Sequence, residues 1–319
     1  MLSEFQFLEN LRQKYNLKKI GDDCAVLPED SRHDLVMTTD LLVEDIDFRL
    51  DWSKPEFIGH KALAVSLSDV AAMGAKPVWS MVSIGVPERV WKTDFVERFY
   101  EGYLNLAKRY GVELIGGDVS RTPDKIVIDS IAAGEVRKGK AILRSNAKVG
   151  DLIFVTGNLG GAALALKRLE NGERFEFSKQ KKLLLRQLAP NPQTEIGQIL
   201  GEKNLATAMI DLSDGLSSDL AHICRASKVG AKLFAEKIPV ESEILDFKFE
   251  TDKISPALNG GEDFELLFTL SPKKKFQLAK ELQNHQISHI GEVSANAEII
   301  ELIFGEKIHI LEPEGFRHF

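Results

Sequence analysis

The sequence predicts an α/β fold of two domains, and three observations support this prediction. The chain has 319 residues, which is more than a single compact core usually needs. Apolar runs of strand length alternate with segments of helical periodicity in both halves of the chain. A basic segment punctuated by glycines, residues 137–150, separates the two halves. It predicts one domain over residues 1–140 and a second over residues 141–319.

The N-terminal half contains predicted helices and strands in alternation. Amphipathic spacing predicts helices over residues 1–15, 55–74 and 94–110. Apolar runs predict strands over residues 35–39, 79–86, 112–115 and 126–136. The third helix is expected to begin after an N-cap at Thr93 or Asp94 and to end at Gly111.

The C-terminal half repeats this alternation. Strands are predicted over residues 151–156, 206–210 and 264–270. Helices are predicted over residues 160–170, 215–227 and 273–284, with two more flanking the prolines at 190 and 192. Residues 299–311 resemble a β-hairpin that turns at Gly305-Glu306.

Composition and charge exclude several classes of protein. The hydrophobic fraction of 44% and charged fraction of 28% are typical of soluble globular proteins. A net charge of −7 argues against a nucleic-acid-binding surface. No apolar run approaches the ~18 residues of a membrane span, and no secretion signal is visible. With only Cys24 and Cys224, a disulfide framework is not expected, so the sequence predicts a cytoplasmic protein.

Short acidic strings next to the apolar runs are the strongest functional signal. They are Gly21-Asp22-Asp23, Thr38-Thr39-Asp40, Gly116-Gly117-Asp118, Asp211-Leu212-Ser213-Asp214-Gly215 and Gly260-Gly261-Glu262-Asp263. Carboxylate and hydroxyl oxygens suit a hard cation such as Mg²⁺, and glycines let backbone N–H groups approach a phosphate. Because carboxylates repel a polyphosphate, the two fit one site only if divalent cations lie between them. The strings together therefore predict phosphate chemistry with metal ions.

Each string taken alone has an ordinary structural explanation. Gly-Asp-Asp is common in turns, Asp40 can end a strand, and Ser213 or Asp214 can cap the helix that follows. The Gly260–Asp263 string can be a tight turn. Asp69 differs, because it lies within an alanine-rich apolar stretch where an uncompensated carboxylate would be costly. We therefore expect Asp69 to bind metal or accept hydrogen bonds.

Taken in order, these strings resemble the thiamine-monophosphate kinase family. The resemblance rests on the strings above, on the segment Lys61-Ala62-Leu63-Ala64-Val65-Ser66-Leu67-Ser68-Asp69-Val70-Ala71-Ala72-Met73-Gly74-Ala75 and on the C-terminal Gly315-Phe316-Arg317-His318-Phe319. The wider superfamily includes aminoimidazole ribonucleotide synthetase, selenophosphate synthetase and a hydrogenase-maturation protein. The resemblance implies an N-terminal domain that forms a β-barrel with its copy in a homodimer, and a C-terminal domain that closes the active-site cleft. It also implies transfer of the γ-phosphoryl group of ATP to thiamine monophosphate, giving thiamine diphosphate and ADP.

The resemblance also implies roles for individual residues. The expected Mg²⁺ ligands are Asp23, Thr38, Thr39, Asp40, Asp69, Asp118, Asp211 and Asp214. The expected ATP contacts are Tyr100, Gly117, Asp118, Arg144 and Ser213. Catalysis is expected to depend on Asp69, Asp211 and Arg144, and the substrate is expected to contact Asp47, Glu262 and Phe316. Asp47 stands where the family has a histidine, in a string that here reads Glu44-Asp45-Ile46-Asp47-Phe48.

Two other interpretations are compatible with the strings. The protein could be a different ATP-dependent enzyme of the same superfamily, with Asp47 favouring another phosphorylated heterocycle. The selenophosphate branch needs a cysteine in a glycine-rich loop and the hydrogenase branch a C-terminal cysteine, whereas this chain ends in His318-Phe319. A regulatory nucleotide-binding protein without turnover is the other interpretation, although binding alone would not need so many acidic sites.

Overall fold

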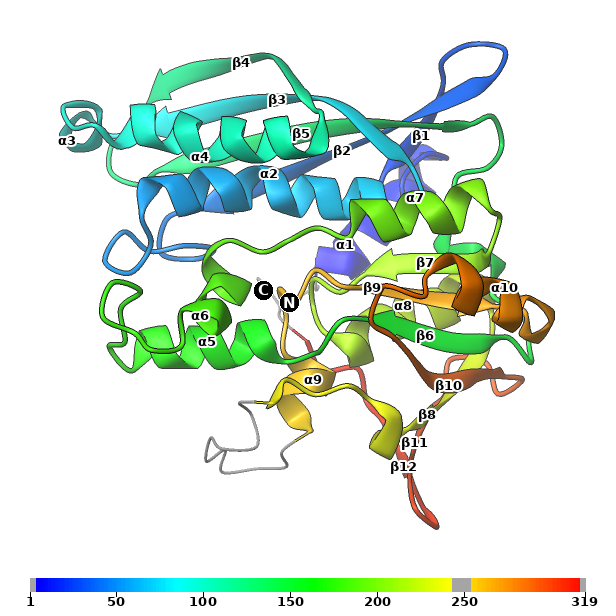
Figure 1. Ribbon diagram of the computed structural model, residues 1–319. Helices are drawn as coiled ribbons and strands as arrows, with labels where there is room; N and C mark the ends of the chain where they lie inside the picture. The colour runs from blue at the N-terminus through cyan, green and yellow to red at the C-terminus, as the bar shows by residue number, and fades with distance from the viewer. Residues whose placement is uncertain (1–3, 243–253, 316–319) are drawn as a thin grey trace.

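The computed structural model describes residues 4–242 and 254–315, and within them the strands form two sheets. The first sheet has the order β1-β2-β5-β3-β4. Its strands are β1 (Ala25–Pro28), β2 (His33–Val43), β3 (Lys76–Val86), β4 (Glu113–Arg121) and β5 (Val127–Arg137). β3 and β4 are parallel, while the other neighbours are antiparallel. All five strands come from the N-terminal half of the chain (Figure 1).

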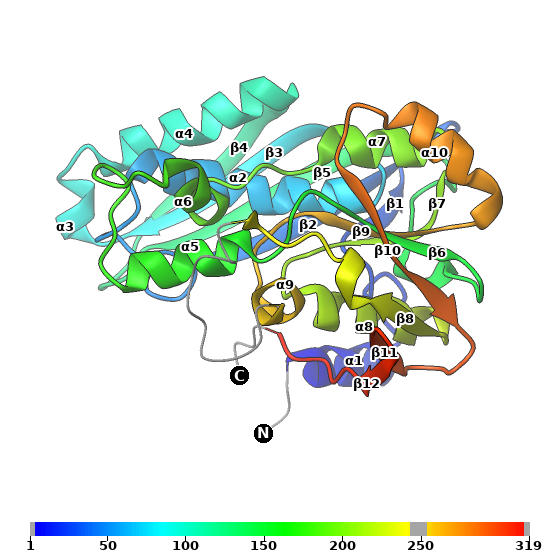
Figure 2. The same cartoon turned by 60° about the horizontal axis from the view of Figure 1, so that its bottom comes forward.

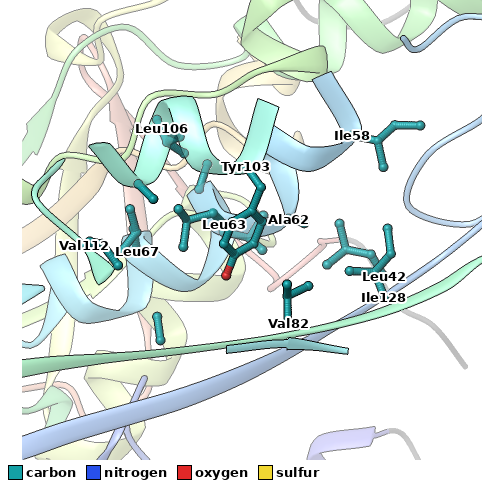
Figure 3. Packing of buried hydrophobic residues seen from close by; sticks show 14 of the residues in the cluster. Leu42, Ile58, Ala62, Leu63, Leu67, Val82, Tyr103, Leu106, Val112 and Ile128 are labelled. Atoms are coloured by element: carbon teal, nitrogen blue, oxygen red, sulfur yellow. The ribbon is translucent and has the colours of Figure 1, made fainter. Parts of the chain in front are cut away.

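Two long helices cover one face of this sheet. They are α2 (Pro55–Ala72) and α4 (Phe95–Tyr110), preceded in the chain by α1 (Glu4–Tyr15) and, before α4, by the short α3 (Glu88–Trp91). Figure 3 shows the Tyr103 ring of α4 lying between α2 and the sheet, close to Val82 and Leu63. The helix α4 begins after Asp94 and ends at Gly111, whose φ of 67° lies in the left-handed region, as the sequence predicts.

The second sheet is built from the C-terminal half and has the order β12-β11-β8-β10-β6-β9-β7 among the described residues. Its strands are β6 (Leu152–Thr156), β7 (Ala206–Asp211), β8 (Gly230–Phe234), β9 (Leu266–Leu270), β10 (Ile287–Ser294), β11 (Ile300–Phe304) and β12 (Lys307–Ile310). The helices of this half are α5 (Gly161–Glu170), α6 (Lys181–Leu188), α7 (Thr194–Glu202), α8 (Leu216–Ser227), α9 (Ser255–Asn259) and α10 (Lys275–Glu281). Figure 2 shows α7 and α10 on one side of the sheet and α8 on the other.

Helix α2 joins the two halves. It is buried along nearly its whole length because α4 and the first sheet cover one side and α7 and β7 contact the other. Its last turn, Ala71 and Ala72, packs into the same apolar cluster as Leu200 of α7 and Phe268 of β9. A helix that is apolar all round is expected in such a position. The functional residues of α2 are therefore held rigidly from two directions.

The predicted α/β class is confirmed, and most predicted elements are found close to their expected bounds. One placement is wrong: Gly116, Gly117 and Asp118 do not follow the strand after Val112 but lie inside β4, which runs on to Arg121. The short strand β1, the strand β8 and the helices α3 and α9 were not predicted, and α10 is shorter than expected. β1 (Ala-Val-Leu-Pro) is only four residues long and β8 (Gly-Ala-Lys-Leu-Phe) is interrupted by a lysine, so neither is a continuous apolar run of strand length.

Candidate active site

Three carboxylates from distant parts of the chain meet between the two halves. Asp23 comes from the bend before β1, Asp69 from α2 and Asp211 from the last position of β7. Each offers an oxygen atom, and these atoms lie within 4.8 Å of one another. An oxygen-only cluster of this size is suited to a hard divalent cation.

Hydroxyl groups hold two of these carboxylates, Asp69 and Asp211, and a fourth one, Asp40, in place. Thr38 Oγ1 donates to Asp69 Oδ2 at 2.5 Å, and Ser68 Oγ donates to Asp211 Oδ2 at 2.6 Å. Asp40 Oδ2 accepts from Ser66 Oγ at 2.7 Å. Thr38 lies on β2 and Ser66 and Ser68 lie on α2, so the two elements that carry Asp40 and Asp69 also supply the donors.

Burial and mutual repulsion raise the pKa values of these acids. Burial, followed by the charge of Asp23, raises the pKa of Asp211 to about 8. Burial, with Asp129 and Asp23 as further causes, raises the pKa of Asp40 to about 6. The pKa of Asp69 lies well above its ordinary value, first through burial and then through Asp40 and Asp211. A bound cation would stabilise this site, because it offsets the negative charge of the ionised carboxylates.

Arg144 supplies positive charge at the edge of the cluster. Its Nη2 lies 2.5 Å from Asp23 Oδ1, and its backbone N–H donates to Asp22 Oδ1 at 2.8 Å. Burial acts to lower the pKa of Arg144, but the charge of Asp23, with Asp69 and Asp211 further away, raises it overall. The guanidinium therefore stays charged and can bind an anion such as a phosphate.

A second group of ligand-type side chains lies at the start of α8. Ligand atoms of Asp214, Asp219 and His222 lie within 4.8 Å of one another. The prediction that Ser213 or Asp214 caps this helix is wrong, because Gly215 is the N-cap residue and no side-chain cap is formed there. Instead, Asp219 accepts the N–H groups of Asp214 and Gly215 at 3.2 and 3.0 Å. Asp219 thus accepts the backbone N–H groups of this turn. Ser213 and Asp214 lie in the wall of the cavity described next.

A cavity of about 580 Å³ opens between the two halves and reaches the carboxylates of Asp40 and Asp214. It is lined by predicted site residues from several segments, namely Asp40, Asp47, Ser213, Asp214 and Glu262. Its apolar wall includes Ile46, Phe48 and Trp52. Asp47 Oδ2 accepts the Val43 N–H at 2.7 Å, so this carboxylate also holds its own turn. The combination of apolar wall and polar groups is typical of a small-molecule site.

The remaining predicted site residues lie elsewhere. Thr39 and Asp118 lie on the face of the first sheet opposite α2, Thr39 on β2 and Asp118 on the edge strand β4. Gly117 precedes Asp118, and its close approach to the Val82 carbonyl leaves no room for a side chain. Tyr100 lies on α4, where its ring packs edge-on against Phe99 at 5.4 Å. Phe316 lies outside the described residues.

Comparison with known proteins identifies the family. The model for "AIR synthase related protein, N-terminal domain" matches residues 21–136, and that for the C-terminal domain matches residues 148–302. The thiamine-monophosphate kinase of Buchnera aphidicola (Schizaphis graminum) is 38% identical over 100% of this chain and 98% of its own length. That of Bacillus subtilis is 36% identical over 94% of this chain and 93% of its own length. The chain belongs to the thiamine-monophosphate kinase family.

Solved structures agree with this membership. The structure of AaThiL complexed with AMPPCP and TMP has a TM-score of 0.87 and 31% identity, covering 100% of this chain and 97% of that one. The hydrogenase maturation protein HypE in complex with ATP is 18% identical, with a TM-score of 0.72 and coverage of 95% of this chain and 91% of that one. This second likeness shows the shared fold alone.

Three polar residues that contact predicted site residues or line the cavity are not predicted from the sequence. Lys61 on α2 is buried and lines the cavity, and Asp129 on β5 accepts from Thr39 Oγ1 at 2.5 Å. The third is Asp219 of α8. Lys61, like Asp69, is a charged residue within an apolar helix, so the same sequence feature marks it. Asp129 and Asp219 lie in ordinary polar contexts, and nothing in the sequence distinguishes them.

Proposed function

We propose that this chain carries out the reaction of its family, the ATP-dependent phosphorylation of thiamine monophosphate to thiamine diphosphate. A phosphate oxygen of thiamine monophosphate attacks the γ-phosphorus of ATP, a new P–O bond forms, and the bond to the β–γ bridging oxygen breaks to release ADP. The observation that supports this most is the buried cluster of Asp23, Asp69 and Asp211 beside a cavity large enough for a small heterocyclic substrate.

The carboxylates present fit Mg²⁺. The donor set is made of oxygens, it is buried or half-buried, and the raised pKa values of Asp40 and Asp211 indicate that negative charge there lacks compensation. We assign as ligands Asp23, Thr38, Thr39, Asp40, Asp69, Asp118, Asp211 and Asp214. When bound, Mg²⁺ neutralises charge on the phosphates and favours their approach to the acidic residues.

The chain's own residues provide positioning and charge. Arg144 can bind a phosphate oxygen, and Ser213 and Glu262 line the cavity from the C-terminal half. Because the second pKa of a phosphate monoester is ~6, the attacking group is already largely ionised at neutral pH and needs no dedicated general base. Catalysis then consists mainly of orientation and charge neutralisation.

The position of Asp118 supports a homodimer. Leu41 of β2 pairs with Asp129 of β5, Asp129 with Ser83 of β3, and Ser83 with Asp118 of β4. Asp118 is thus three strands away from β2, or roughly 14 Å at the usual strand spacing. Thr39 and Asp118 cannot share one metal ion at that separation within a single chain. A second copy facing the same sheet surface would supply Asp118 and Gly117 to the site.

The wider organisation follows from the same assignment. The first sheet ends with β5 at Arg137 and the second begins with β6 at Leu152, which supports a boundary near residue 140. The second domain then closes the cleft over the substrate.

No helix among the described residues is long and apolar enough to cross a membrane. Cys24 and Cys224 are free and buried, which is compatible with a place in the cytoplasm.

The decisive test is the release of ADP by the purified protein with ATP and Mg²⁺. Thiamine monophosphate, thiamine and no acceptor are compared, and thiamine diphosphate is measured in parallel. We expect ADP only with thiamine monophosphate, matched by an equal amount of thiamine diphosphate. ADP release that does not depend on thiamine monophosphate would contradict the proposed function.

A further inference from the structure

A buried lysine lies in the wall of the cavity and has no role in the mechanism so far. Lys61 belongs to the second turn of α2, and only 3% of its surface is exposed. Burying an ammonium group is costly unless it is paired and hydrogen-bonded. The partners of Lys61 therefore indicate what the charge is for.

Lys61 brings together segments from both halves of the chain. Its Nζ lies 2.5 Å from Glu262 Oε1 and 3.0 Å from the backbone carbonyl oxygen of Asp47. The other oxygen of Glu262 accepts a hydrogen bond from Gln187 Nε2 of α6. All four residues line the cavity. Glu262 is thus held through both of its oxygens, one by a buried cation and one by a neutral amide.

This arrangement leaves Glu262 able to bind a ligand. A carboxylate has about four acceptor positions, and Lys61 and Gln187 occupy two of them. The side chain of Glu262 is 30% exposed, so its remaining positions can reach the cavity. The backbone of Glu262 has a φ of 66°, in the left-handed region that side-chain-bearing residues seldom adopt. The contacts to Lys61 and Gln187 help to fix a carboxylate on this strained backbone.

The negative charge of the cavity lining indicates a second role for Lys61. Acidic lining residues outnumber basic ones, with Asp40, Asp47, Glu170, Asp214 and Glu262 against Lys61 and Lys167. A phosphate monoester carries about −1.5 to −2 charges at pH 7 and would be repelled by this lining. Lys61 neutralises Glu262 from the protein side and so reduces that repulsion without blocking the carboxylate.

We propose that Lys61 is a positioning residue for the phosphorylated acceptor, which it serves by orienting and neutralising Glu262. The proposal rests on the proposed function, since it takes thiamine monophosphate as the acceptor that Glu262 contacts. The neighbouring loop residues Asp263 and Glu265 are held by a different cation, Arg186, which is not among the cavity-lining residues. Arg186 thus holds the loop in place, and Lys61 is not required to hold it.

The test compares Lys61→Met, Lys61→Arg, Glu262→Gln and the double variant Lys61→Met/Glu262→Gln by steady-state kinetics. Because a hydrogen bond to a charged group contributes about 1.5–3 kcal/mol, Lys61→Met should raise the KM for thiamine monophosphate about 10- to 100-fold and that for ATP by less than about twofold. Lys61→Arg should recover part of the loss. Lys203→Met, which removes an ion pair to Glu281 away from the cavity, is the matched control and should leave both KM values unchanged.

The double variant separates positioning from a merely structural role. If Lys61 acts through Glu262, Lys61→Met should have little further effect once Glu262 is glutamine. Equal effects in the two backgrounds, or equal rises in both KM values, would overturn the proposal. If Lys61→Met does not fold, Lys61→Arg carries the test, because its altered geometry should change the KM for thiamine monophosphate alone.

The two proposals fail in different ways. A wild-type protein that releases no ADP with thiamine monophosphate overturns the proposed function, and the role of Lys61 falls with it. An active wild type whose KM for thiamine monophosphate is unchanged in the folded Lys61 variants overturns the role of Lys61 alone.

Discussion

At the scale of single residues, the site is defined by negative charge that the protein does not fully compensate. Arg144 pairs with Asp23, whereas Asp69 and Asp40 accept hydrogen bonds from neutral hydroxyl groups, those of Thr38 and Ser66. Such a cluster does not stabilise the folded state, since each buried carboxylate costs free energy when it ionises. The cluster is explained if cations and phosphates bind there.

Asp69 provides the most direct mutational test. Asp69→Asn keeps the size of the side chain but removes a charge from the centre of the cluster. We expect kcat to fall by about 100-fold or more, because a preorganised electrostatic contact of the transition state is lost. The free energy of unfolding, measured with urea, should stay the same or rise, because a buried acid has been removed.

Asp124→Asn is the matched control for this change, since Asp124 is an exposed carboxylate away from the cluster. Its kcat should equal that of the wild type. Near-normal turnover in Asp69→Asn would remove the metal assignment.

The raised pKa values also predict how stability depends on pH. The folded-state pKa of Asp211, about 8, exceeds the ordinary aspartate value of ~3.9, so the folded protein binds a proton that the unfolded chain releases. The metal-free protein should therefore lose stability as pH rises from about 4 to about 8 and level off above that. Because Mg²⁺ competes with these protons, its stabilising effect should be larger at pH 8 than at pH 6.

Thermal unfolding with Mg²⁺ and with a chelator at both pH values measures this effect. Asp211→Asn should weaken the pH dependence in the chelator. A rise in Tm on Mg²⁺ addition that is the same at pH 6 and pH 8 would contradict the explanation.

Part of the site can be predicted from the sequence alone. Asp23, Asp69 and Asp211 were singled out from their motifs, and the structure brings them together. Lys61 and Asp129 were missed because their importance lies in partners far away along the chain, Glu262 and Thr39. Pairings of this kind depend on tertiary structure, which local patterns do not encode.

At the scale of elements, α2 is the part on which the site depends. It carries Ser66, Ser68 and Asp69 on the side of the cluster, and it packs against α4 on another side. The sequence predicts the helix, but it does not show why the helix contains Gly59. In the structure a Cβ at Gly59 would lie 1.9 Å from the Phe99 carbonyl oxygen, so α2 and α4 touch through their backbones.

This contact predicts a large effect of a small substitution. Gly59→Ala should lower the free energy of unfolding by about 1–3 kcal/mol or more, because the two helices must move apart in a closely packed core. The general preference of helices for alanine acts in the opposite direction and is smaller, about 1 kcal/mol. Urea unfolding measures the difference.

Gly116→Ala serves as the control, because the nearest atom to its added Cβ is Met81 Cε at 3.4 Å, an ordinary contact. It should change stability much less than Gly59→Ala. An equal or smaller effect at Gly59 would show that α2 and α4 are not packed through the backbone at this point.

At the scale of the whole molecule, the first sheet has one covered and one open face. Val82 and Ile84 of β3 are buried under the helices, while Leu41 of β2 is 62% exposed on the other face. On the edge strand β4, Ile115 and Val119 are also exposed. An apolar, unpaired edge beside an open face favours association with another chain.

If the site uses Asp69 of one chain and Asp118 of another, two inactive variants should restore activity to each other. Asp118→Ala and Asp69→Asn are purified separately, mixed, unfolded and refolded together. Each mixed dimer then contains one site in which both residues are intact and one in which both are changed. With random pairing, half of the dimers are mixed, so activity should reach about a quarter of the wild-type value.

The result discriminates between the two arrangements because a site built within one chain gives no restoration in any mixture. Each variant refolded alone serves as the control and should stay inactive. A mixture as inactive as its components, with dimers present by light scattering, would show that Asp118 and Asp69 act within the same chain. Restoration would place the active site across the interface, which explains why a carboxylate three strands away belongs to it.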